Sequence, residues 1–390
     1  PQYGTSTEDG LLRWTIPPVT AAIFNVPAAD AQGNLYVKNA AMIAEAREIA
    51  RAARRNGGIA IANVGLLVDA GYDEIFLRHD EVDAIVYDPN TEQTGSVPHR
   101  RYWDFLTPNS SLDVKEGMAR VLFINRLVGV TPVRKPAELA MARLAAAIYT
   151  DHARPGGIVD IGVGLPEEVA RMLHEHGVLD QVTPMTETGV IGGMAAPGIY
   201  FGSAVNPTEI VSSAEAFRRM YKHLDAVILG MLEADGDGNV NVSKRGEGPM
   251  NYVGPGGFVD ITRCADSIIF IGSWMAHSDV RLQGHEMRVL KAGPCKFVER
   301  VSEITFSGQE ALARGKLVYY ITNIGVFRLT ERGMELQRIM PGIDLERDVR
   351  GVCKMPFVLP EGGPPAPVPE DVMTGRGFRL ALAAQEAAAK

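Results

Sequence analysis

Apolar residues along the chain follow two spacings, one typical of buried strands and one typical of amphipathic helices. Short apolar runs predict buried strands at 59–67, 84–87, 158–161, 226–231, 267–271 and 318–322. Three- and four-residue spacing predicts helices at 40–56, 133–149, 167–176 and, in an alanine-rich form, 378–390. Helices or hairpins separate the strands, so we predict an α/β fold with open, mostly parallel or mixed sheets.

Two segments of the chain repeat each other without a gap. Residues 19–37 and 224–242 each read as an apolar strand, an Asp-x-x-Gly-Asn turn and a second short strand. Favoured turn chemistry can produce two such hairpins independently, but the ungapped match favours a duplicated α/β unit. When Asn34 of the first repeat is aligned with Asn239 of the second, the part of the first repeat that would correspond to 156–193 falls before Pro1. We therefore expect two related α/β/α units, the first of them incomplete, with the remainder on another polypeptide, removed or left out.

The length and this repeat suggest three parts. The chain has 390 residues, of which 46% are hydrophobic and 22% charged, which suits two or three globular domains. We assign 1–130 to the later part of the first unit and 131–357 to a complete second unit. The Pro/Gly-rich stretch and terminal helix form the third part, at 358–390.

Composition narrows the classes of function. The net charge is −8, without a basic block that would follow a phosphate backbone, so we expect no nucleic-acid partner. No apolar run reaches the ~18 residues that a membrane-spanning helix needs. The three cysteines lack Cys-x-x-Cys spacing, which favours a reducing cytoplasm and argues against a disulfide framework or a zinc site.

One carboxylate stands out as a candidate nucleophile. Glu187 lies among small residues in the run 184–197, close to Gly189, Gly192 and Gly193, which let backbone and ligand approach closely. A glutamate with an ordinary pKa near ~4.3 is ionised at neutral pH and needs no general base to attack. It does need a bound electrophile and donors for the developing oxyanion. The alternative is that Glu187 is a solvated turn residue.

Two further glycine clusters are candidates for binding negative charge. Gly162 and Gly164 lie between a predicted strand and a helix, where free N–H groups and a helix N-terminus favour an anion. Gly254, Gly256 and Gly257 follow the second hairpin and could direct N–H groups toward a thioester or an oxyanion. Either cluster could instead be a tight turn that binds no ligand.

The sequence resembles the class I coenzyme A-transferases, in particular the single-chain acetate, propionate and 3-oxoacid type. Matching stretches span about 133–357, and Glu187 stands at the place of the catalytic glutamate of that family. The stretches that carry the resemblance are 162–166, 186–193, 237–244, 254–258 with 296–299, and 326–330 with 341–348. The first 130 residues resemble the later part of the family's N-terminal half, whose Gly-rich opening is not in this chain.

The resemblance implies a ping-pong transfer of coenzyme A between an acyl-CoA and a small carboxylic acid. Glu187 would carry a glutamyl-CoA thioester, and the clusters at 162–164 and 254–257, together with Asn241 in the 237–244 motif, would bind CoA or the oxyanion. Coenzyme A would be a substrate, and no metal would be required. We expect a role in short-chain fatty acid or ketone body metabolism, in a homo-oligomer or with a partner chain that carries the missing part.

The sequence departs from the family in loops expected to flank the pocket. Residues 221–225, 275–278 and 323–325 replace small residues of the family with bulkier ones. Two of these loops introduce His223 and His277, which are either surface or packing residues or side chains that narrow the acid pocket or act on water. Two alternatives to the transferase therefore stay open: a CoA-thioester or ring-opening hydrolase, and a non-catalytic subunit.

Overall fold

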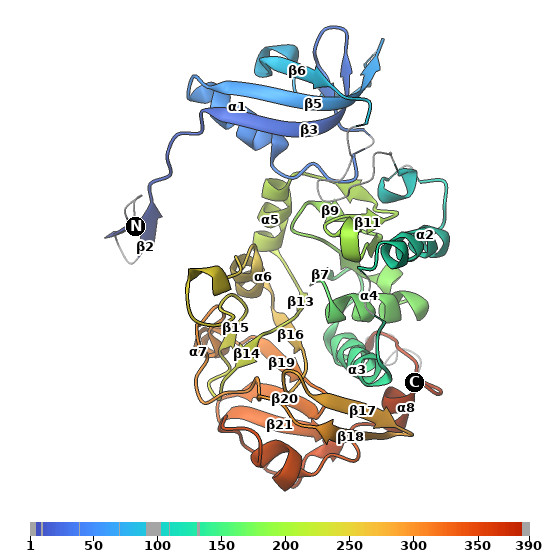
Figure 1. The fold of residues 1–390 in the computed structure, drawn as a ribbon, viewed down its shortest axis with the longest axis vertical. Coiled ribbons are helices and arrows are strands. Elements are labelled where there is room, and N and C mark those ends of the chain that lie inside the picture. Colours follow the sequence, from blue (N-terminus) through green and yellow to red (C-terminus); the bar gives the residue numbers. More distant parts are fainter. Residues whose placement is uncertain are drawn as a thin grey trace.

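The computed structural model describes residues 5–8, 11–38, 40–69, 71–90, 103–108, 110–130 and 133–383. Two separate hydrophobic cores divide this part of the chain, one under each of two main sheets (Figure 1). The fold is a mixed α/β fold built from two units, which confirms the predicted fold class. Among the described residues, no helix has the length and apolar character that crossing a membrane requires.

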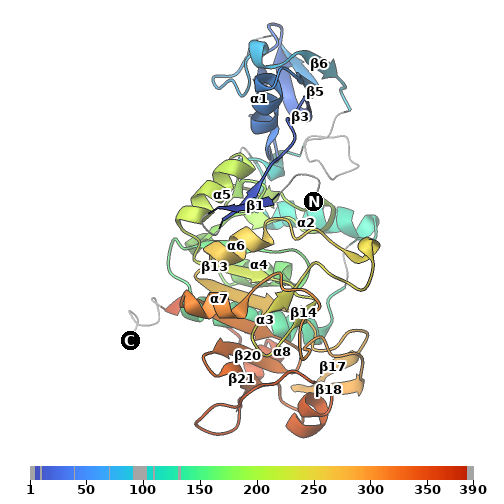
Figure 2. The same cartoon turned by 90° about the vertical axis from the view of Figure 1, so that its left-hand side faces the viewer.

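The smaller N-terminal unit is a four-stranded sheet with one helix on one face (Figure 2). Its strand order is β4-β3-β5-β6, with β3, β5 and β6 parallel. The elements are β3 (Ala21–Asp30), β4 (Leu35–Tyr36), α1 (Ala46–Arg55), β5 (Ile59–Val68) and β6 (Ala84–Tyr87). A separate hairpin of β1 (Thr5–Glu8) and β2 (Leu11–Trp14) precedes them. Gly57 ends α1 with a φ of 72°, as the Gly-Gly stop predicted.

The larger unit is an eight-stranded sheet of order β22-β21-β20-β19-β16-β13-β7-β8. The five strands from β19 to β8 are parallel to one another, while β20 pairs antiparallel with both of its neighbours, β19 and β21. The strands are β7 (Ile158–Ile161), β8 (Thr183–Pro184), β13 (Ala226–Leu229), β16 (Ser267–Ile271), β19 (Leu317–Ile321), β20 (Gly325–Thr330), β21 (Gly333–Ile339) and β22 (Ala366–Pro367).

Helices and short hairpins surround this sheet. The helices are α2 (Val114–Leu127), α3 (Pro136–His152), α4 (Leu165–Glu175), α5 (Ser213–Lys222), α6 (Phe258–Cys264), α7 (Gly308–Ala313) and α8 (Glu370–Thr374). The short strands are β9 (Val190–Ile191), β10 (Met194–Ala195), β11 (Ala204–Val205), β12 (Glu209–Ile210), β14 (Glu233–Ala234), β15 (Val240–Asn241), β17 (Asp279–Gln283) and β18 (Glu286–Lys291).

The two repeated hairpins fold in the same way. Asp30 Oδ1 accepts hydrogen bonds of 2.9 Å from the N–H groups of Gln32 and Asn34. Asp235 Oδ1 accepts the equivalent bonds from Asp237 and Asn239, at 3.1 and 3.0 Å. Each aspartate therefore closes its turn through the same Asx geometry. The parallel order β3-β5-β6 also matches β13-β16-β19, which supports the duplicated unit inferred from the sequence.

Two expectations need correction. The division between the cores does not fall at residue 130, because Phe105, Leu106 and the buried face of α2 pack in the larger core. The predicted helix at 378–390 is wrong for 378–382, where the chain is not helical. Burial alternates there, with Phe378, Leu380 and Leu382 inward, so packing of an extended segment overrides the helical preference of alanine. Residues 384–390 lie outside the described part.

Candidate active site

Glu187 lies in a turn just beyond the carboxyl end of β8, where the neighbouring parallel strands β7 and β13 also end. The N–H of Gly189 donates to the carbonyl of Thr186 at 3.0 Å, which closes the turn around the glutamate. The hydroxyls of Thr186 and Thr188 lie 2.8 Å apart on either side of it. The side chain of Glu187 is neither fully exposed nor fully buried. Its position at the carboxyl edge of a parallel sheet is typical of ligand sites in open α/β folds.

The glycines after Glu187 are required by the close packing of neighbouring segments of the chain. Gly189, Gly192 and Gly193 have φ values of 96°, 72° and 70°. A Cβ atom on them would overlap the carbonyl of Val211, the side chain of Thr208 and the carbonyl of Val205, respectively. They therefore allow 189–195 to pack closely against 204–211. Gly192 and Gly193 also line a small cavity of about 10 Å³, but contact of these three glycines with a ligand stays a prediction.

The central feature of the site is the close approach of Glu187 to Gly257, from the second glycine cluster. A Cβ atom on Gly257 would overlap Oε1 of Glu187 and would lie 2.7 Å from Cζ of Phe217. Two sequence motifs separated by about 70 residues therefore meet at the carboxylate. A Cβ on Gly254 or Gly256 would have no atom within 4 Å, so this side of the loop opens toward free space.

The electrostatic surroundings of Glu187 favour its neutral form more than water does. Burial, and secondly the negative charge of Asp260, raise the pKa of Glu187. The hydroxyl of Tyr221, on α5, donates a hydrogen bond to Asp260, on α6. A raised pKa makes the ionised carboxylate more basic, and therefore a stronger nucleophile once it has lost its proton.

Asp160 on β7 is a second carboxyl group at this edge, and sequence analysis missed it. Only 5% of the residue is exposed, and its Oδ2 has no hydrogen-bond partner within the described chain. Burial, and secondly the charge of Glu187, raise the pKa of Asp160 well above its usual range. Ionisation of Glu187 therefore disfavours ionisation of Asp160. The available signal was a single acidic residue inside a four-residue apolar strand.

Lys296 is another group at this edge to which sequence analysis gave no role. Its Nζ donates to the carbonyl of Met231 at 2.8 Å, just after β13. A Cβ on Gly272, which follows β16, would lie 3.4 Å from the same atom. Burial lowers the pKa of Lys296. The ammonium group therefore lies where the central strands end, on the Glu187 side of the sheet.

The other residues predicted to bind CoA, Gly162, Gly164 and Asn241, differ in their surroundings. Gly164 has a φ of 88° before α4, and Arg134 donates to its carbonyl at 2.7 Å, so a cation stands beside this turn. Gly162 packs against Leu229. Asn241 is fully buried, donates to Glu233 and to the carbonyl of Lys244, and accepts from two N–H groups of its own loop. The Asn241 side chain thus shapes its loop, and contact of these three residues with CoA stays a prediction.

Both histidines are exposed. His223 precedes the amino end of β13, where its Nε2 lies 2.9 Å from Asp225 Oδ2, and Arg154 contacts both side chains. This is the sheet edge opposite to Glu187. His277 has a φ of 53° and lies two residues before β17. Their exposure favours the surface interpretation, and a role of His277 in the acid pocket stays a prediction.

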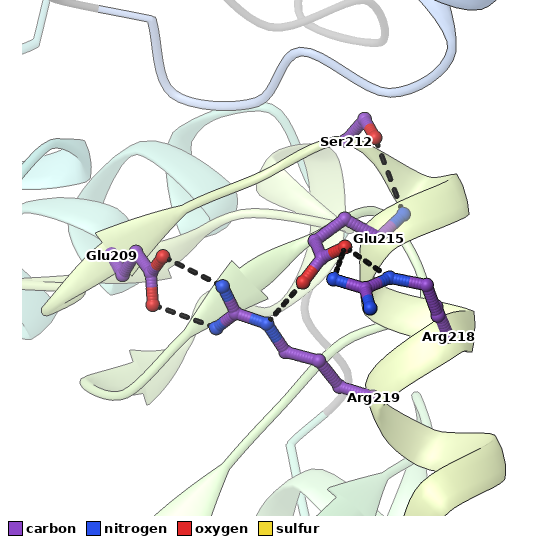
Figure 3. Close-up of polar contacts among 5 residues, drawn as sticks. All are labelled: Glu209, Ser212, Glu215, Arg218 and Arg219. Atoms are coloured by element: carbon purple, nitrogen blue, oxygen red, sulfur yellow. Dashed lines mark hydrogen bonds and ion pairs between the residues drawn. The ribbon is translucent and has the colours of Figure 1, made fainter.

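A network of charged groups fixes the helix that borders the site (Figure 3). Arg219 on α5 binds both carboxylate oxygens of Glu209, at 2.8 and 2.9 Å, and also contacts Glu215 at 2.8 Å. The hydroxyl of Ser212 caps the helix by accepting from the N–H of Glu215. The network ties β12 to α5 and so holds Phe217 against the Glu187–Gly257 contact.

Two proteins with similar sequences are named CoA-transferases. The chain is 31% identical over 343 residues to the acetate CoA-transferase YdiF of Escherichia coli K12, a match that covers 86% of this chain and 60% of YdiF. It is 30% identical over 340 residues to the caffeate CoA-transferase of Acetobacterium woodii, covering 84% and 61% of the two chains. No protein-family model matches the chain.

The crystal structure of the acyl-CoA transferase YdiF apoenzyme from E. coli O157:H7 superposes with a TM-score of 0.81 and 26% identity. The match covers 97% of this chain and 68% of that one. A YdiF thioester complex with CoA matches equally well, with a TM-score of 0.80. The chain belongs to the class I CoA-transferase family. It spans about 60% of the length of the curated relatives that it matches.

The environment of Asp160 predicts a pH-dependent effect of Asp160→Asn on stability. Asp160 stays protonated in the folded protein but ionises in the unfolded chain above about pH 4. The free energy of unfolding of the wild type therefore falls as pH rises, until the pH reaches the raised pKa of Asp160 in the folded protein. An asparagine does not titrate, so the free energy of unfolding of the variant should rise relative to that of wild type by up to ~1.4 kcal/mol per pH unit. Urea unfolding of both proteins at pH 5, 6 and 7 measures this gain. An exposed Asp180→Asn variant is the control, and a constant difference between Asp160→Asn and wild type would contradict the assignment.

The Glu187–Gly257 contact predicts that Gly257→Ala impairs the site although it adds one carbon. The new methyl group must displace the carboxylate or Phe217, and a misplacement of about 1 Å can cost ~10²-fold in rate. For the transfer of CoA proposed below, chromatographic separation of acetyl-CoA from the newly formed CoA thioester measures the loss. Gly254→Ala, in the same loop but with open space around it, should stay within about threefold of wild type. Equal effects of the two substitutions would show that Glu187 and Gly257 do not meet.

Proposed function

We propose that the protein transfers coenzyme A between an acyl-CoA and a carboxylic acid, with Glu187 as the nucleophile. The observation that carries the proposal is the contact of this half-buried glutamate with Gly257 at the carboxyl edge of the sheet. Family membership supplies the reaction class, and the site supplies a nucleophile with the required surroundings. The proposal concerns the whole protein, of which this chain holds the part with the glutamate.

The proposed reaction runs through two covalent states of Glu187. The carboxylate attacks the carbonyl carbon of the acyl-CoA, and the C–S bond breaks to give an acyl-glutamyl anhydride and CoA thiolate. The thiolate then attacks the glutamyl carbonyl, which releases the first carboxylate and leaves a glutamyl-CoA thioester. An incoming carboxylate reverses these steps and leaves as its CoA ester. Every bond broken is replaced, so the exchange needs no external oxidant, reductant or metal.

The local surroundings suit these steps. The phenyl ring of Phe217 and the backbone at Gly257 cover the carboxylate, which limits the access of water to an anhydride or a thioester. The N–H groups of the 254–257 loop are candidate donors to the oxyanion, because this loop adjoins the carboxylate and opens on its other side. Burial and the charge of Glu187 raise the pKa of Asp160, which disfavours a second negative charge at the site.

The acyl group and the acceptor acid stay open within this proposal. The named relatives act on acetate in one case and caffeate in another, so family membership alone does not define the size of the acid pocket. We propose a small carboxylic acid, in short-chain fatty acid or ketone body metabolism in the cytoplasm. We also propose that the working protein is a homo-oligomer or includes a further segment that completes the N-terminal unit.

The transferase is preferred to the other two functions that the sequence left open. A hydrolase would need a base for water near Glu187, whereas His223 lies at the opposite edge of the sheet and His277 is exposed. A non-catalytic subunit would not need a half-buried carboxylate with a raised pKa against a glycine loop. The transferase uses these features directly.

Replacement of Glu187 tests the proposal. Glu187→Gln should lower the transfer rate by at least about 10³-fold, because the amide cannot form the anhydride or the thioester. Borohydride added after acyl-CoA should reduce a thioester at residue 187 in wild type alone, and peptide mass spectrometry locates the reduced residue. Asp180→Asn, which alters an exposed carboxylate of the same unit outside the network around α5, is the control. A folded Glu187→Gln protein with most of the wild-type rate would exclude the mechanism.

The negative charge of Asp260 predicts the pH dependence of transfer. Glu187 attacks only when ionised, so kcat/KM should fall as pH drops through its pKa, which is above that of an ordinary glutamate. Asp260→Asn removes a negative charge and should lower that pKa, moving the acid limb to lower pH. Tyr221→Phe keeps the charge and should cause no such move. Profiles of kcat/KM for acyl-CoA between pH 4 and 7 decide between these outcomes, and an unmoved limb in Asp260→Asn would contradict this coupling.

A further inference from the structure

Two of the three cysteines lie side by side, although they come from segments far apart in the chain. Cys295 follows β18 and forms a β-bridge with Met275, while Cys353 follows the helical turn at 345–350. Their thiol groups hydrogen-bond each other. Both residues are half-buried and pack at the margin of the larger core. The two thiols therefore meet in residues that solvent still reaches.

The backbone of Phe297 holds the two thiols in this arrangement. Cys353 Sγ donates to the carbonyl of Phe297 at 3.2 Å, and the N–H of Met355 donates to the same sulfur at 3.3 Å. The N–H of Phe297 in turn bonds the sulfur of Cys295. The ring of Phe297 is anchored, because it packs against Trp274 with ring centroids 4.6 Å apart. The thiols are thus fixed on a rigid support, and a disulfide between them requires no separation of packed segments.

The shared hydrogen bond makes the two thiols chemically unequal. It lowers the pKa of Cys295 and raises the pKa of Cys353. The thiolate is the nucleophile in thiol–disulfide exchange, so Cys295 reacts first and Cys353 is placed to resolve the product. Burial, and secondly the charge of Asp260, raise the pKa of Cys264, the third cysteine. Cys264 therefore serves as an internal control for thiol reactivity.

We propose that Cys295 and Cys353 form a thiol–disulfide exchange site that takes a low-molecular-weight disulfide, such as oxidised glutathione, as its oxidant. The Cys295 thiolate attacks one sulfur of this reagent and breaks its S–S bond, which gives a mixed disulfide and one free thiolate. The Cys353 thiol loses its proton to that thiolate and attacks the Cys295 sulfur. The 295–353 disulfide forms, and the second half of the reagent leaves as a thiolate that takes up the proton first lost by Cys295. The reagent gains two electrons, and the cysteine pair loses two.

Oxidation of this pair acts on Lys296, the residue after Cys295. The Nζ atom of Lys296 bonds the carbonyl of Met231 on the side of the sheet where Glu187 lies. A covalent bond to Cys353 pulls Cys295 from its present position and moves the adjoining backbone. We therefore expect the oxidised protein to transfer CoA at least ~5-fold more slowly, because small displacements at an active site reduce the rate. This consequence rests on the proposed function, whereas formation of the disulfide does not.

The experiment treats the reduced, purified protein, with every chain that accompanies it, with oxidised glutathione at neutral pH. Peptide mass spectrometry without reduction should find residues 295 and 353 linked, with the loss of two hydrogen atoms, and Cys264 unmodified. Cys353→Ser should stop at a glutathione adduct on Cys295, and Cys264→Ser, the matched control, should behave like wild type. The transfer rate of wild type should fall at least ~5-fold and recover with dithiothreitol. Cys295→Ser should keep its own rate under the same treatment.

Other results overturn the proposal. A folded protein that does not react, an adduct on Cys264 in preference to Cys295, or a 295–353 link that forms only in urea would show that the pair is not an exchange site. An unchanged transfer rate after complete linkage would remove the connection to Lys296. A protein that forms the link but transfers no CoA even when reduced would support the exchange site and contradict the proposed function, so the two failures are distinguishable.

Discussion

The approach of the Glu187 carboxylate to the backbone at Gly257 is the contact on which the rest of the site depends. It requires a glycine at 257, because any side chain there would occupy the position of the carboxylate or of Phe217. It also requires α5 to stay in place, which the bonds of Arg219 to Glu209 and Glu215 achieve. The glycines at 189–193 then let the turn that carries Glu187 pack against the segment leading into α5. Glu187 is thus positioned mainly by backbone contacts.

Two carboxyl groups near one sheet edge differ in burial. Burial raises the pKa of both Asp160 and Glu187, and the charge of Glu187 raises that of Asp160 further. Glu187 is partly open to the site, whereas Asp160 is enclosed in β7. Ionisation of Glu187 therefore disfavours ionisation of Asp160.

The two units of the repeat differ in completeness and meet close to the site. The hairpins closed by Asp30 and Asp235 have the same hydrogen bonds, yet one sheet is covered on both faces and the other on one. At the junction, the N–H of Ser213, which begins α5, donates to the carbonyl of Ala44 at 3.1 Å. The connection into α1 therefore supports the same helix that borders Glu187.

The sequence by itself determined the strands, the paired hairpins and the position of Glu187, because apolar runs, Asp-x-x-Gly-Asn turns and glycine clusters act over short distances. It predicted the family from motifs for the same reason. Only the tertiary structure placed Gly257 against Glu187, enclosed Asp160, and set His223 at the opposite edge of the sheet. It also made 378–382 extended. These features depend on strand order and on packing between residues far apart in the chain, which local spacing does not encode.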